Sequence, residues 1–401
     1  MRGILSEMSS LWMAGSSVAS PLRGSLHSMR ADSVDQQLVL VCSSTGGVAC
    51  LRVDDPMQAG YAWKFPPILH RGAESSQVPL SGVRASSIQW YPHDTNMFIT
   101  AAGSSIHLWD TDSQTCFFSL EIPNCGLLQQ LHMSPNATAH TLLGIAAEQG
   151  KTILCDLRTG HATHMLEGHK GGVKTLAFAP LDTYILATGG QDGCIRLWDI
   201  RNSRILHSLD AHNICWDVEA GAMAQETIRH HARAVPSMGT AHAFKEQAHR
   251  GSLQQLLFAP SGLYLYSLAD DPQARIVQWS RRGQNTGLHF EMEGDIPLGN
   301  KVPLLLSSDE RTLYTVDDAG SVEMVDVPSG QEVERRKIQF VAVTACALAG
   351  PGDALLLSGG RNGQLTFHWH PLPWESAQET MARLRGMASG FEEEETDDWD
   401  L

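Results

Sequence analysis

The sequence predicts an all-β propeller, and three observations support that fold class. Short apolar and β-branched runs alternate with turns rich in Gly, Asp, Asn and Pro along most of the chain. Two of these runs end in Trp-Asp, which is typical of the repeats of a β-propeller. The 401 residues are 42% hydrophobic and 18% charged, which suits a globular chain that buries a sizeable core.

The clearest repeat spans residues 168–201 and has the order of signals expected for a four-stranded blade of the WD type. It begins with Gly-His, and its predicted strands are 173–178, 184–188 and 195–201. An Asp-Gly turn precedes the last of these strands, which contains Trp-Asp. Residues 168–201 therefore predict one complete blade.

His169, Asp192 and Trp198 are expected to share a hydrogen-bond network inside this blade. A strand Ser or Thr usually completes such a network, but the position five residues after the histidine is Lys174, with Thr175 one residue further on. We therefore expect a network of three members at best. Each buried hydrogen bond contributes about 1 kcal/mol net, and a stranded partner costs about 1–3 kcal/mol. The His–Asp pair is thus interpreted as structural, not catalytic.

Six further repeats are predicted, at 38–51, 87–110, 130–158, 253–279, 304–325 and 341–369. The first of them shows only the two later strands of a blade, so its earlier strands are missing or hidden within 13–37. The repeat before 168–201 has Cys155 where Trp is expected. Residues 213–248 are interpreted as an insertion near the first strand of the fifth blade. The propeller is assigned to 38–372, which holds seven blades of about 40–45 residues once the insertion is set aside.

Both ends of the chain are interpreted as segments outside the propeller. Residues 1–37 are predicted to form a short helix followed by a loop rich in Ser, Gly and Arg. The helix is predicted from an apolar face with a helical period, and its apolar residues are Ile4, Leu5, Met8, Leu11 and Trp12. So short a helix must dock on the propeller or on a partner. Residues 373–401, with seven acids in the last ten positions, are predicted to be a disordered tail.

Composition argues against several classes of function. The net charge of −15 argues against nucleic acid as the main partner, because phosphate contacts need a basic surface. Eight cysteines without a Cys-x-x-Cys pair are interpreted as reduced intracellular thiols. No apolar run is long enough to span a membrane. The Arg- and Ser-rich first 30 residues leave an organellar transit peptide as an alternative.

The sequence contains no recognisable catalytic or cofactor motif. A nucleophile elbow, a zinc-protease helix and a phosphate-binding Gly loop are all missing from it. The insertion and its flanks do carry residues of zinc-ligand type, namely His212, Cys215, His230, His231, His242 and His249. Their spacing matches no compact zinc module. We therefore predict no metal, no cofactor and no catalytic residue, and interpret the chain as a binding protein rather than an enzyme.

Several stretches resemble the Cockayne syndrome group A family. The stretches that carry the resemblance are Gln89–Thr95, His132–Pro135, Tyr184–Thr188 and Leu197–Arg201, followed by Leu209 and His212-Asn213. The start at Met1–Ser6 and the tail at Phe391–Trp399 are also similar to that family. The resemblance is dense over 83–213, thinner over 248–280 and mostly topological over 285–372.

The resemblance implies a substrate receptor of a cullin-4 RING ubiquitin ligase. The family is implied to act in the nucleus, in transcription-coupled nucleotide excision repair, with RNA polymerase II and the Cockayne syndrome group B repair factor as partners. It is implied to dock on the adaptor DNA damage-binding protein 1 through Trp-Asp-x-Arg, here with Asp199 and Arg201. A degenerate copy in the preceding repeat contains Asp156 and Arg158. The N-terminal helix is implied to insert into the same adaptor.

The position of Arg201 suits this docking role but is also compatible with a WD-repeat protein that belongs to no ligase. Arg201, at the blade edge, can present its planar fork to a carboxylate or carbonyl of a partner. Many WD repeats, however, end in Trp-Asp-x-Arg without joining any ligase, so a WD-repeat scaffold for chromatin or transcription complexes is the alternative. The segment between helix and first blade is shorter than in the family, which puts the completeness of that blade and the closure of the ring in doubt.

Overall fold

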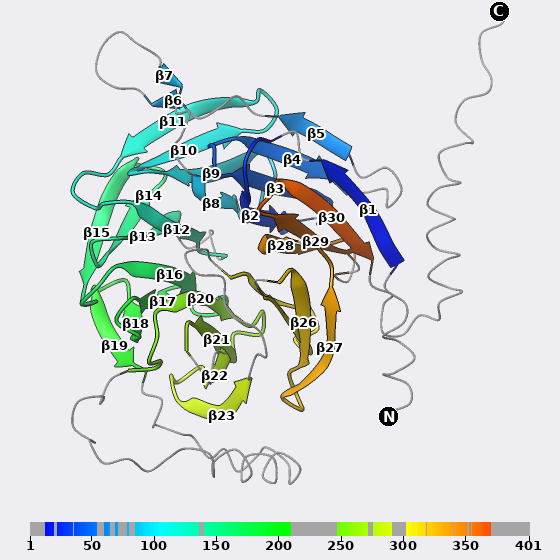
Figure 1. The fold of residues 1–401 in the computed structure, drawn as a ribbon. Coiled ribbons are helices and arrows are strands. Elements are labelled where there is room, and N and C mark those ends of the chain that lie inside the picture. Colours follow the sequence, from blue (N-terminus) through cyan, green and yellow to red (C-terminus); the bar gives the residue numbers. More distant parts are fainter. Residues whose placement is uncertain are drawn as a thin grey trace, which may run out of the picture.

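Seven four-stranded antiparallel sheets, counted over the described residues, stand around a central axis as the blades of a propeller (Figure 1). The computed structural model describes residues 13–19, 22–34, 36–53, 60–64, 69–70, 78–79, 85–135, 140–209, 247–271, 276–290, 302–317, 319–339, 341–350, 353 and 355–369. These residues form strands and turns but no α-helix. The predicted all-β, seven-bladed propeller is confirmed. The predicted N-terminal helix, nearly all of the insertion 213–248 and the tail 373–401 lie outside the described residues.

In blades one to six the strands follow one another along the chain, from the innermost strand to the outermost (Figure 1). Blades one to three comprise β2 (Leu26–Ala31), β3 (Leu38–Ser43), β4 (Val48–Arg52) and β5 (Gly60–Lys64); β8 (Ala85–Trp90), β9 (Met97–Ala102), β10 (Ser105–Asp110) and β11 (Thr115–Glu121); and β12 (Leu128–Met133), β13 (Leu142–Ala147), β14 (Lys151–Asp156) and β15 (His161–Glu167). Blades four to six comprise β16 (Val173–Phe178), β17 (Ile185–Gly190), β18 (Ile195–Asp199) and β19 (Arg204–Ser208); β20 (Leu253–Phe258), β21 (Tyr264–Ala269), β22 (Ile276–Ser280) and β23 (Asn285–Phe290); and β24 (Leu304–Leu306), β25 (Thr312–Val316), β26 (Ser321–Asp326) and β27 (Gln331–Lys337). A short pair, β6 (Leu69–His70) and β7 (Val78–Pro79), lies between blades one and two in the sequence.

The seventh blade joins the two ends of the propeller. It comprises β28 (Val343–Ala349), β29 (Leu355–Gly360), β30 (Gln364–Trp369) and, as its outermost strand, β1 (Met13–Ala19). β1 pairs antiparallel with β30, from Met13 opposite Trp369 to Ala19 opposite Gln364. The ring is therefore closed, and the first blade has all four strands. The prediction of a loop over 13–37 was wrong, because both β1 and β2 lie in that range.

β2 was not predicted from the sequence because a β-bulge interrupts its alternation of buried and exposed residues. The pairing register shifts between Leu26 and Ser28, so His27 is an extra residue. Leu26 and Met29 are both buried, although they stand three positions apart. A search for alternating apolar residues does not find such a strand. β1, with the sequence MAGSSVA, is poor in the β-branched and aromatic residues that mark strands.

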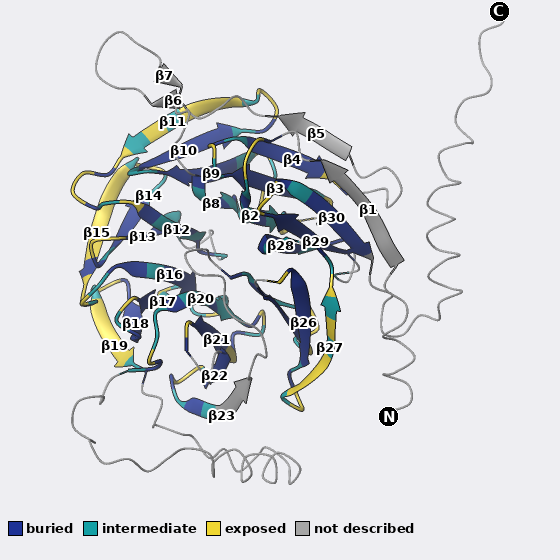
Figure 2. Ribbon diagram, in the orientation of Figure 1, coloured by how far each residue is buried: buried dark blue, intermediate teal, exposed yellow. Residues whose placement is uncertain are grey.

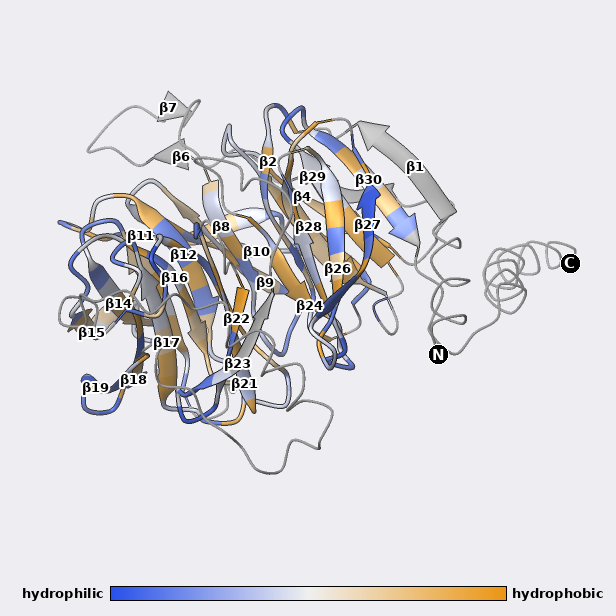
Figure 3. Cartoon of the chain, turned by 60° about the horizontal axis from the view of Figure 1, so that its bottom comes forward, coloured by the Kyte–Doolittle hydropathy of each residue, from blue (hydrophilic) through white to orange (hydrophobic). Residues whose placement is uncertain are grey.

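The hydrophobic core lies between neighbouring blades. Trp198 of β18 is buried in a cluster with Leu154 of the third blade and Leu176 of its own blade. Trp109 on β10 and Trp279 on β22 occupy the matching positions in their blades and are also buried. The outermost strands β11, β15, β19 and β27 are largely exposed (Figure 2), and β27 is mostly hydrophilic (Figure 3). In these four blades the sheet is thus buried near the axis and exposed to solvent at its outermost strand.

The inner strands share a β-bulge at the same place. In six of the seven blades, as far as the structure describes them, the register shifts after the first residue of the inner strand. The six extra residues are all polar, and they are His27, Ser86, Gln129, Lys174, Gln254 and Thr344. Lys174, which by spacing along the sequence stands where the Ser or Thr of the fourth-blade network was expected, is one of these bulge residues instead.

Side chains at or next to these bulges connect five of the seven pairs of neighbouring inner strands, as far as the structure describes them. An inner strand is an edge strand, and an unpaired backbone N–H that is buried there would cost about 1–3 kcal/mol. Side-chain oxygens accept these N–H groups across the blade boundary: Ser87 Oγ from Leu131 (3.1 Å), Gln130 Oε1 from Leu176 (3.2 Å), Thr175 Oγ1 from Leu256 (2.9 Å) and Gln255 Oε1 from Leu304 (3.0 Å). The hydroxyl of Thr344 donates to the carbonyl of Leu26, which links the seventh blade to the first. We call these five links the inter-blade belt.

The stability of the propeller is expected to fall as the pH is lowered from about 6.5 towards 4. Burial, and then the charge of Arg30, lower the pKa of His132 to about 4, and its ring Nδ1 accepts the backbone N–H of Phe178 at 3.3 Å. An unfolded His has a pKa of about 6.5, so the unfolded chain binds one more proton in this window, and the free energy of unfolding drops by about 1.4 kcal/mol per pH unit.

Urea unfolding between pH 7 and pH 4 measures this dependence. The variant His132→Gln is expected to show a shallower loss of stability than the wild type across that window, because it has no ring to protonate. Equal slopes for the two proteins would contradict the assignment.

Candidate functional site

Two turns of the fourth blade lie side by side at one end of the strands. One turn, 179–184, connects β16 to β17, and the other, 200–203, connects β18 to β19. Ile185 pairs with Asp199, and the backbone N–H of Ile200 donates to the carbonyl of Tyr184 at 3.0 Å. The pairing of β17 with β18 therefore brings Tyr184 next to the Asp199–Arg201 segment.

Arg201 is exposed but held in one orientation. Its Nε donates to Asp199 Oδ1 at 2.9 Å and its Nη2 to Oδ2 at 2.7 Å, while its backbone N–H also donates to Oδ1 at 3.0 Å. The guanidinium carbon lies 4.9 Å from the centroid of the Tyr184 ring, within the range of a cation–π contact. The Arg201 side chain is 59% exposed despite these contacts.

The hydrogen bonds to Asp199, which we call the clamp, change which parts of the Arg201 side chain can contact a partner. The sequence suggested that its fork is open to a partner carboxylate, but in the structure Asp199 already accepts from that fork. The hydrogen bonds from Arg201 lower the pKa of Asp199 and raise that of Arg201, so both groups stay charged. What remains for a partner is the Nη1 edge and the exposed surface of the guanidinium. The side chain is thus ordered before any partner binds.

Exposed apolar residues lie in turns of blades four and five at the same end of the strands as Arg201. The turn between β20 and β21 packs against Leu181, since a Cβ added at Gly262 would lie 2.9 Å from Leu181 Cγ. Arg281 joins the two blades through Asp182, with its Nη2 2.6 Å from Oδ2. We define the turn face as Leu181, Tyr184, Arg201, Leu263 and Tyr264, whose apolar members are between 37% and 58% exposed.

The degenerate copy in the third blade has the turn without the clamp. Asp156 Oδ1 accepts the backbone N–H of Arg158 at 3.0 Å and the hydroxyl of Thr141 at 2.7 Å. The Thr141 hydrogen bond, above all, lowers the pKa of Asp156. Among the interactions of the described residues, no ion pair joins Asp156 to the exposed Arg158 side chain. Cys155, at the position of Trp198, is buried and carries no indole N–H for a blade network.

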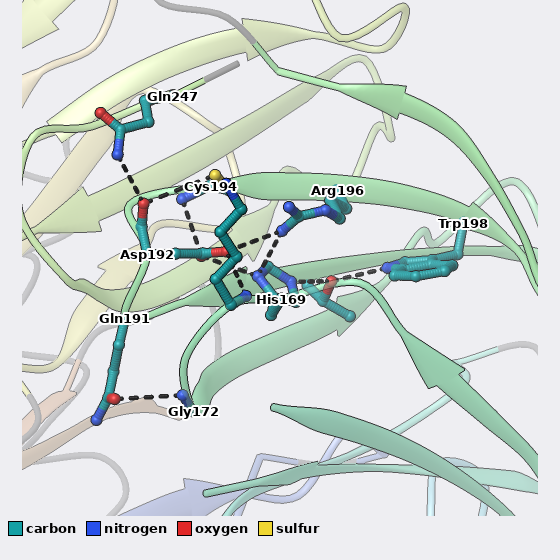
Figure 4. Close-up of polar contacts among 10 residues, drawn as sticks. His169, Gly172, Gln191, Asp192, Cys194, Arg196, Trp198 and Gln247 are labelled. Atoms are coloured by element: carbon teal, nitrogen blue, oxygen red, sulfur yellow. Dashed lines mark hydrogen bonds and ion pairs between the residues drawn. The ribbon is translucent and has the colours of Figure 1, made fainter. Parts of the chain in front are cut away.

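A complete four-membered network holds the fourth blade together (Figure 4). Trp198 Nε1–H donates to Thr188 Oγ1 at 2.8 Å, and Thr188 Oγ1 lies 2.8 Å from His169 Nε2. His169 Nδ1 lies 3.0 Å from Asp192 Oδ1, and Arg196 forms an ion pair with the same carboxylate at 3.2 Å. Burial lowers the pKa of His169, which keeps the ring neutral. The expectation of at most three members was wrong, because Thr188 of β17 supplies the hydroxyl.

The fifth blade repeats this network with Ser in place of Thr. His249 Nδ1 lies 2.6 Å from Asp271 Oδ2, His249 Nε2 lies 2.7 Å from Ser267 Oγ, and Trp279 Nε1–H donates to Ser267 Oγ at 2.8 Å. Ser, His and Asp in this order resemble a nucleophilic triad. Ser267 is 0% exposed, however, so no substrate can reach its hydroxyl. The arrangement is structural, and His249, which the sequence grouped with possible zinc ligands, belongs to it.

Several predicted site residues lie outside the described residues. These are Ile4, Leu5, Met8, Leu11 and Trp12 of the predicted helix, and His212, Cys215, His230, His231 and His242 of the insertion. Among the described residues, no group of three or more His, Cys, Asp or Glu side chains could hold a metal ion. No helix within the described ranges is long and apolar enough to cross a membrane.

Comparisons with known proteins agree with the propeller. The family model described as "WD domain, G-beta repeat" matches residues 160–199, which cover most of the fourth blade. The WD repeat-containing protein ATCSA-1 of Arabidopsis thaliana is 26% identical over 88% of this chain and 86% of its own length. The Small ribosomal subunit protein RACK1y of Oryza sativa subsp. japonica is 33% identical over 23% of this chain and 28% of its own. The WD repeat-containing protein SL1-17 of Schistosoma mansoni is 24% identical over 42% and 56%.

Proposed function

We propose that this WD-repeat propeller is the substrate-recognition subunit of a cullin-4 RING ubiquitin ligase that acts in transcription-coupled nucleotide excision repair. WD-repeat propellers are generally non-catalytic scaffolds or adaptors, and the matched family model points to no catalytic role. Similarity to the WD repeat-containing protein ATCSA-1 along most of both chains supports a role like that of the Cockayne syndrome group A family. In this proposal the nucleus is the site of action, and RNA polymerase II and the Cockayne syndrome group B repair factor are further partners.

The observation that carries the proposal is the geometry of Arg201. Its side chain is more than half exposed, yet Asp199 and Tyr184 fix it in place. Binding a partner therefore costs little of the side-chain entropy that a mobile Arg would lose. Arg and Tyr are also the residue types that most often dominate protein interfaces. We therefore assign the turn face to the adaptor, DNA damage-binding protein 1.

The remaining turn-face residues suit the same contact. Exposed Leu and Tyr side chains around a charged centre have the composition of an interface core, which is rich in aromatic residues and Arg. Arg158, one blade away and without an ion pair to Asp156, is a weaker second contact in this proposal. The predicted helix with Ile4, Met8 and Trp12 is proposed as a separate contact with the adaptor.

Replacing Arg201 by Ala is expected to weaken adaptor binding about tenfold or more, as for other central interface arginines. The loss follows because the adaptor would meet an unpaired Asp199 carboxylate where the structure has an ion pair. Biolayer interferometry with the purified adaptor protein measures the change. Tyr184→Ala should weaken binding as well, since it removes the ring on which the guanidinium rests.

The matched control is Arg361→Ala. Arg361 is also exposed but lies in the turn between β29 and β30, at the opposite end of the strands. It should bind the adaptor like the wild type. Unchanged binding by Arg201→Ala would remove the role of that residue. No adaptor binding by the wild type would overturn the ligase proposal and favour a WD-repeat scaffold without a ligase.

A further inference from the structure

The inner strands surround a cationic pocket at the end opposite the turn face. β16 ends at Phe178 and leads into the turn that contains Tyr184, whereas the bulges lie at the start of the inner strands. The described residues that line the pocket include His27, Ser28, Arg30, Ser86, Gln254 and Thr344. None of its described lining residues is acidic. Four of the six polar bulge residues are thus among those that form the mouth of the central channel.

Arg30 is the charged group among the described residues that line this pocket, and none of those residues carries a carboxylate. Among the interactions of the described residues, the Arg30 guanidinium makes no hydrogen bond or ion pair. Other arginines of the same propeller pair with an aspartate: Arg196 with Asp192, Arg201 with Asp199, Arg281 with Asp182 and Arg335 with Asp317. The contrast is strong in a chain with a net charge of −15, in which acidic residues are abundant.

The environment of Arg30 makes its charge effective. Burial lowers the pKa of Arg30, but a guanidinium remains protonated at physiological pH. Its field reaches His132, whose pKa falls first through burial and then through this charge. A charge withdrawn from water without a partner is costly, and an incoming anion would relieve that cost.

Lys174 supplies a second cation at a bulge position, outside the described residues that line the pocket. It occupies on β16 the bulge position that Ser86 occupies on β8 and Gln254 on β20. Because the blades repeat around one axis, equivalent bulge positions lie at the same height along the channel. The bulge positions therefore present a cation at Lys174 and neutral hydrogen-bond donors at Ser86 and Gln254. Arg30, which lines the pocket, lies three residues beyond the bulge on β2.

We propose that the channel mouth binds a carboxylate side chain of an acidic peptide segment from a partner protein. Arg30 would donate a charged hydrogen bond to the carboxylate, while Ser86 and Gln254 would meet the polar peptide backbone. The acidic surface of the chain repels a long polyanion such as nucleic acid. A single acidic side chain, in contrast, can enter a pocket whose described lining contains Arg30 and no acidic residue.

This site goes beyond adaptor docking, because it lies at the other end of the strands from the turn face. A protein bound at Arg201 leaves the channel mouth open. One molecule can therefore hold an adaptor on one side and an acidic segment of another protein on the other. The site does not depend on the ligase proposal, since its chemistry follows from Arg30 and Lys174 alone.

Fluorescence anisotropy with a fluorescein-labelled tetraglutamate peptide and the full chain at low salt tests the proposal. The wild type should bind this probe and should not bind a tetraglutamine peptide of the same length. Arg30→Gln should bind tetraglutamate about tenfold more weakly, because hydrogen bonds to charged groups are about twice as strong as neutral ones. Lys174→Gln should weaken binding about twofold to fivefold, since the flexible ammonium of Lys174 lies outside the lining of the pocket and contributes less.

Two further variants separate binding from folding. Arg30→Lys keeps the charge and should restore much of the affinity that Arg30→Gln loses. Arg201→Gln, at the other end of the strands, should bind tetraglutamate like the wild type, and Arg30→Gln should still bind the adaptor. Equal tetraglutamate affinity in wild type and Arg30→Gln overturns the proposal, as does equal affinity for tetraglutamate and tetraglutamine. Should Arg30→Gln fail to fold, unchanged affinity in Lys174→Gln overturns it instead.

Discussion

Deleting residues 1–19 is expected to open the propeller ring and to destabilise the whole fold. The deletion removes β1, which pairs with β30 along Met13–Ala19. Each backbone hydrogen bond contributes about 1 kcal/mol net, so the loss of a whole ladder amounts to several kcal/mol. A domain has a total stability of only about 5–15 kcal/mol. The melting temperature and the urea midpoint of the shortened chain should both fall sharply, or the chain should not fold.

A chain that lacks only residues 1–12 is the matched control for this deletion. It keeps β1, so its unfolding curve should stay close to that of the full chain. The longer deletion also exposes β30 as an edge strand, and we expect it to aggregate, which light scattering detects. Similar melting temperatures for the two deletions would show that β1 does not hold the ring closed. Adaptor binding by the shorter deletion separately tests the role of the N-terminal helix.

Replacing Thr188 by Val is expected to destabilise the propeller by about 2–5 kcal/mol. Val keeps the shape of Thr but removes the oxygen that accepts from Trp198 Nε1 and contacts His169 Nε2. Two buried groups then lose their partner, and each costs about 1–3 kcal/mol. Thr188→Ser keeps the hydroxyl and should lose about 1 kcal/mol, for the missing methyl group. Urea unfolding at pH 7 measures both changes.

The pH of this comparison matters because Asp192 titrates in acid. Burial opposes its ionisation, but hydrogen bonds from His169 and Lys170 and the charge of Arg196 hold the pKa of Asp192 well below its usual range. Its contribution is complete above a pH of about 4, the pKa in the unfolded chain, and is lost as the pH falls through the folded value. At pH 7 the difference between Thr188→Val and wild type therefore reports the hydroxyl alone. A difference below about 0.5 kcal/mol would mean that the network contributes no stability.

The repeat period of the sequence predicted the fold well. The strands that it missed share one physical cause, which is the absence of a regular alternation of apolar and polar residues. The repeats that end in Trp109, Trp198 and Trp279 combine alternation, turns and a buried aromatic residue, so their strands are recognisable. β2 is interrupted by the bulge at His27. The outermost strands β11 and β15 are exposed on both faces, so no apolar alternation marks them (Figure 2).

The candidate sites depend on contacts between strands, which spacing along one strand cannot reveal. Counting from His169 pointed to Lys174, but the hydroxyl comes from Thr188 on the neighbouring strand β17. The position of Arg201 was predictable from its motif, whereas its contact with Tyr184 follows from the pairing of β17 with β18. The exposure of its neighbours on the turn face likewise needs the packed blades. The pocket that contains Arg30 forms only when inner strands that are distant in the sequence meet around the channel.

Among the described strands, β1 is translated first, and it pairs with β30, which is translated last. Its partner β30 comprises residues 364–369, so nearly the whole propeller must leave the ribosome before the ring can close. Throughout that interval β1 remains an unpaired strand, and an apolar β-branched segment in that position would pair with other chains. The sequence of β1, with Gly15, Ser16 and Ser17 at its centre, is poorly suited to such pairing. The low β-propensity that made β1 difficult to predict from the sequence also disfavours pairing of this strand with other chains before β30 has been made.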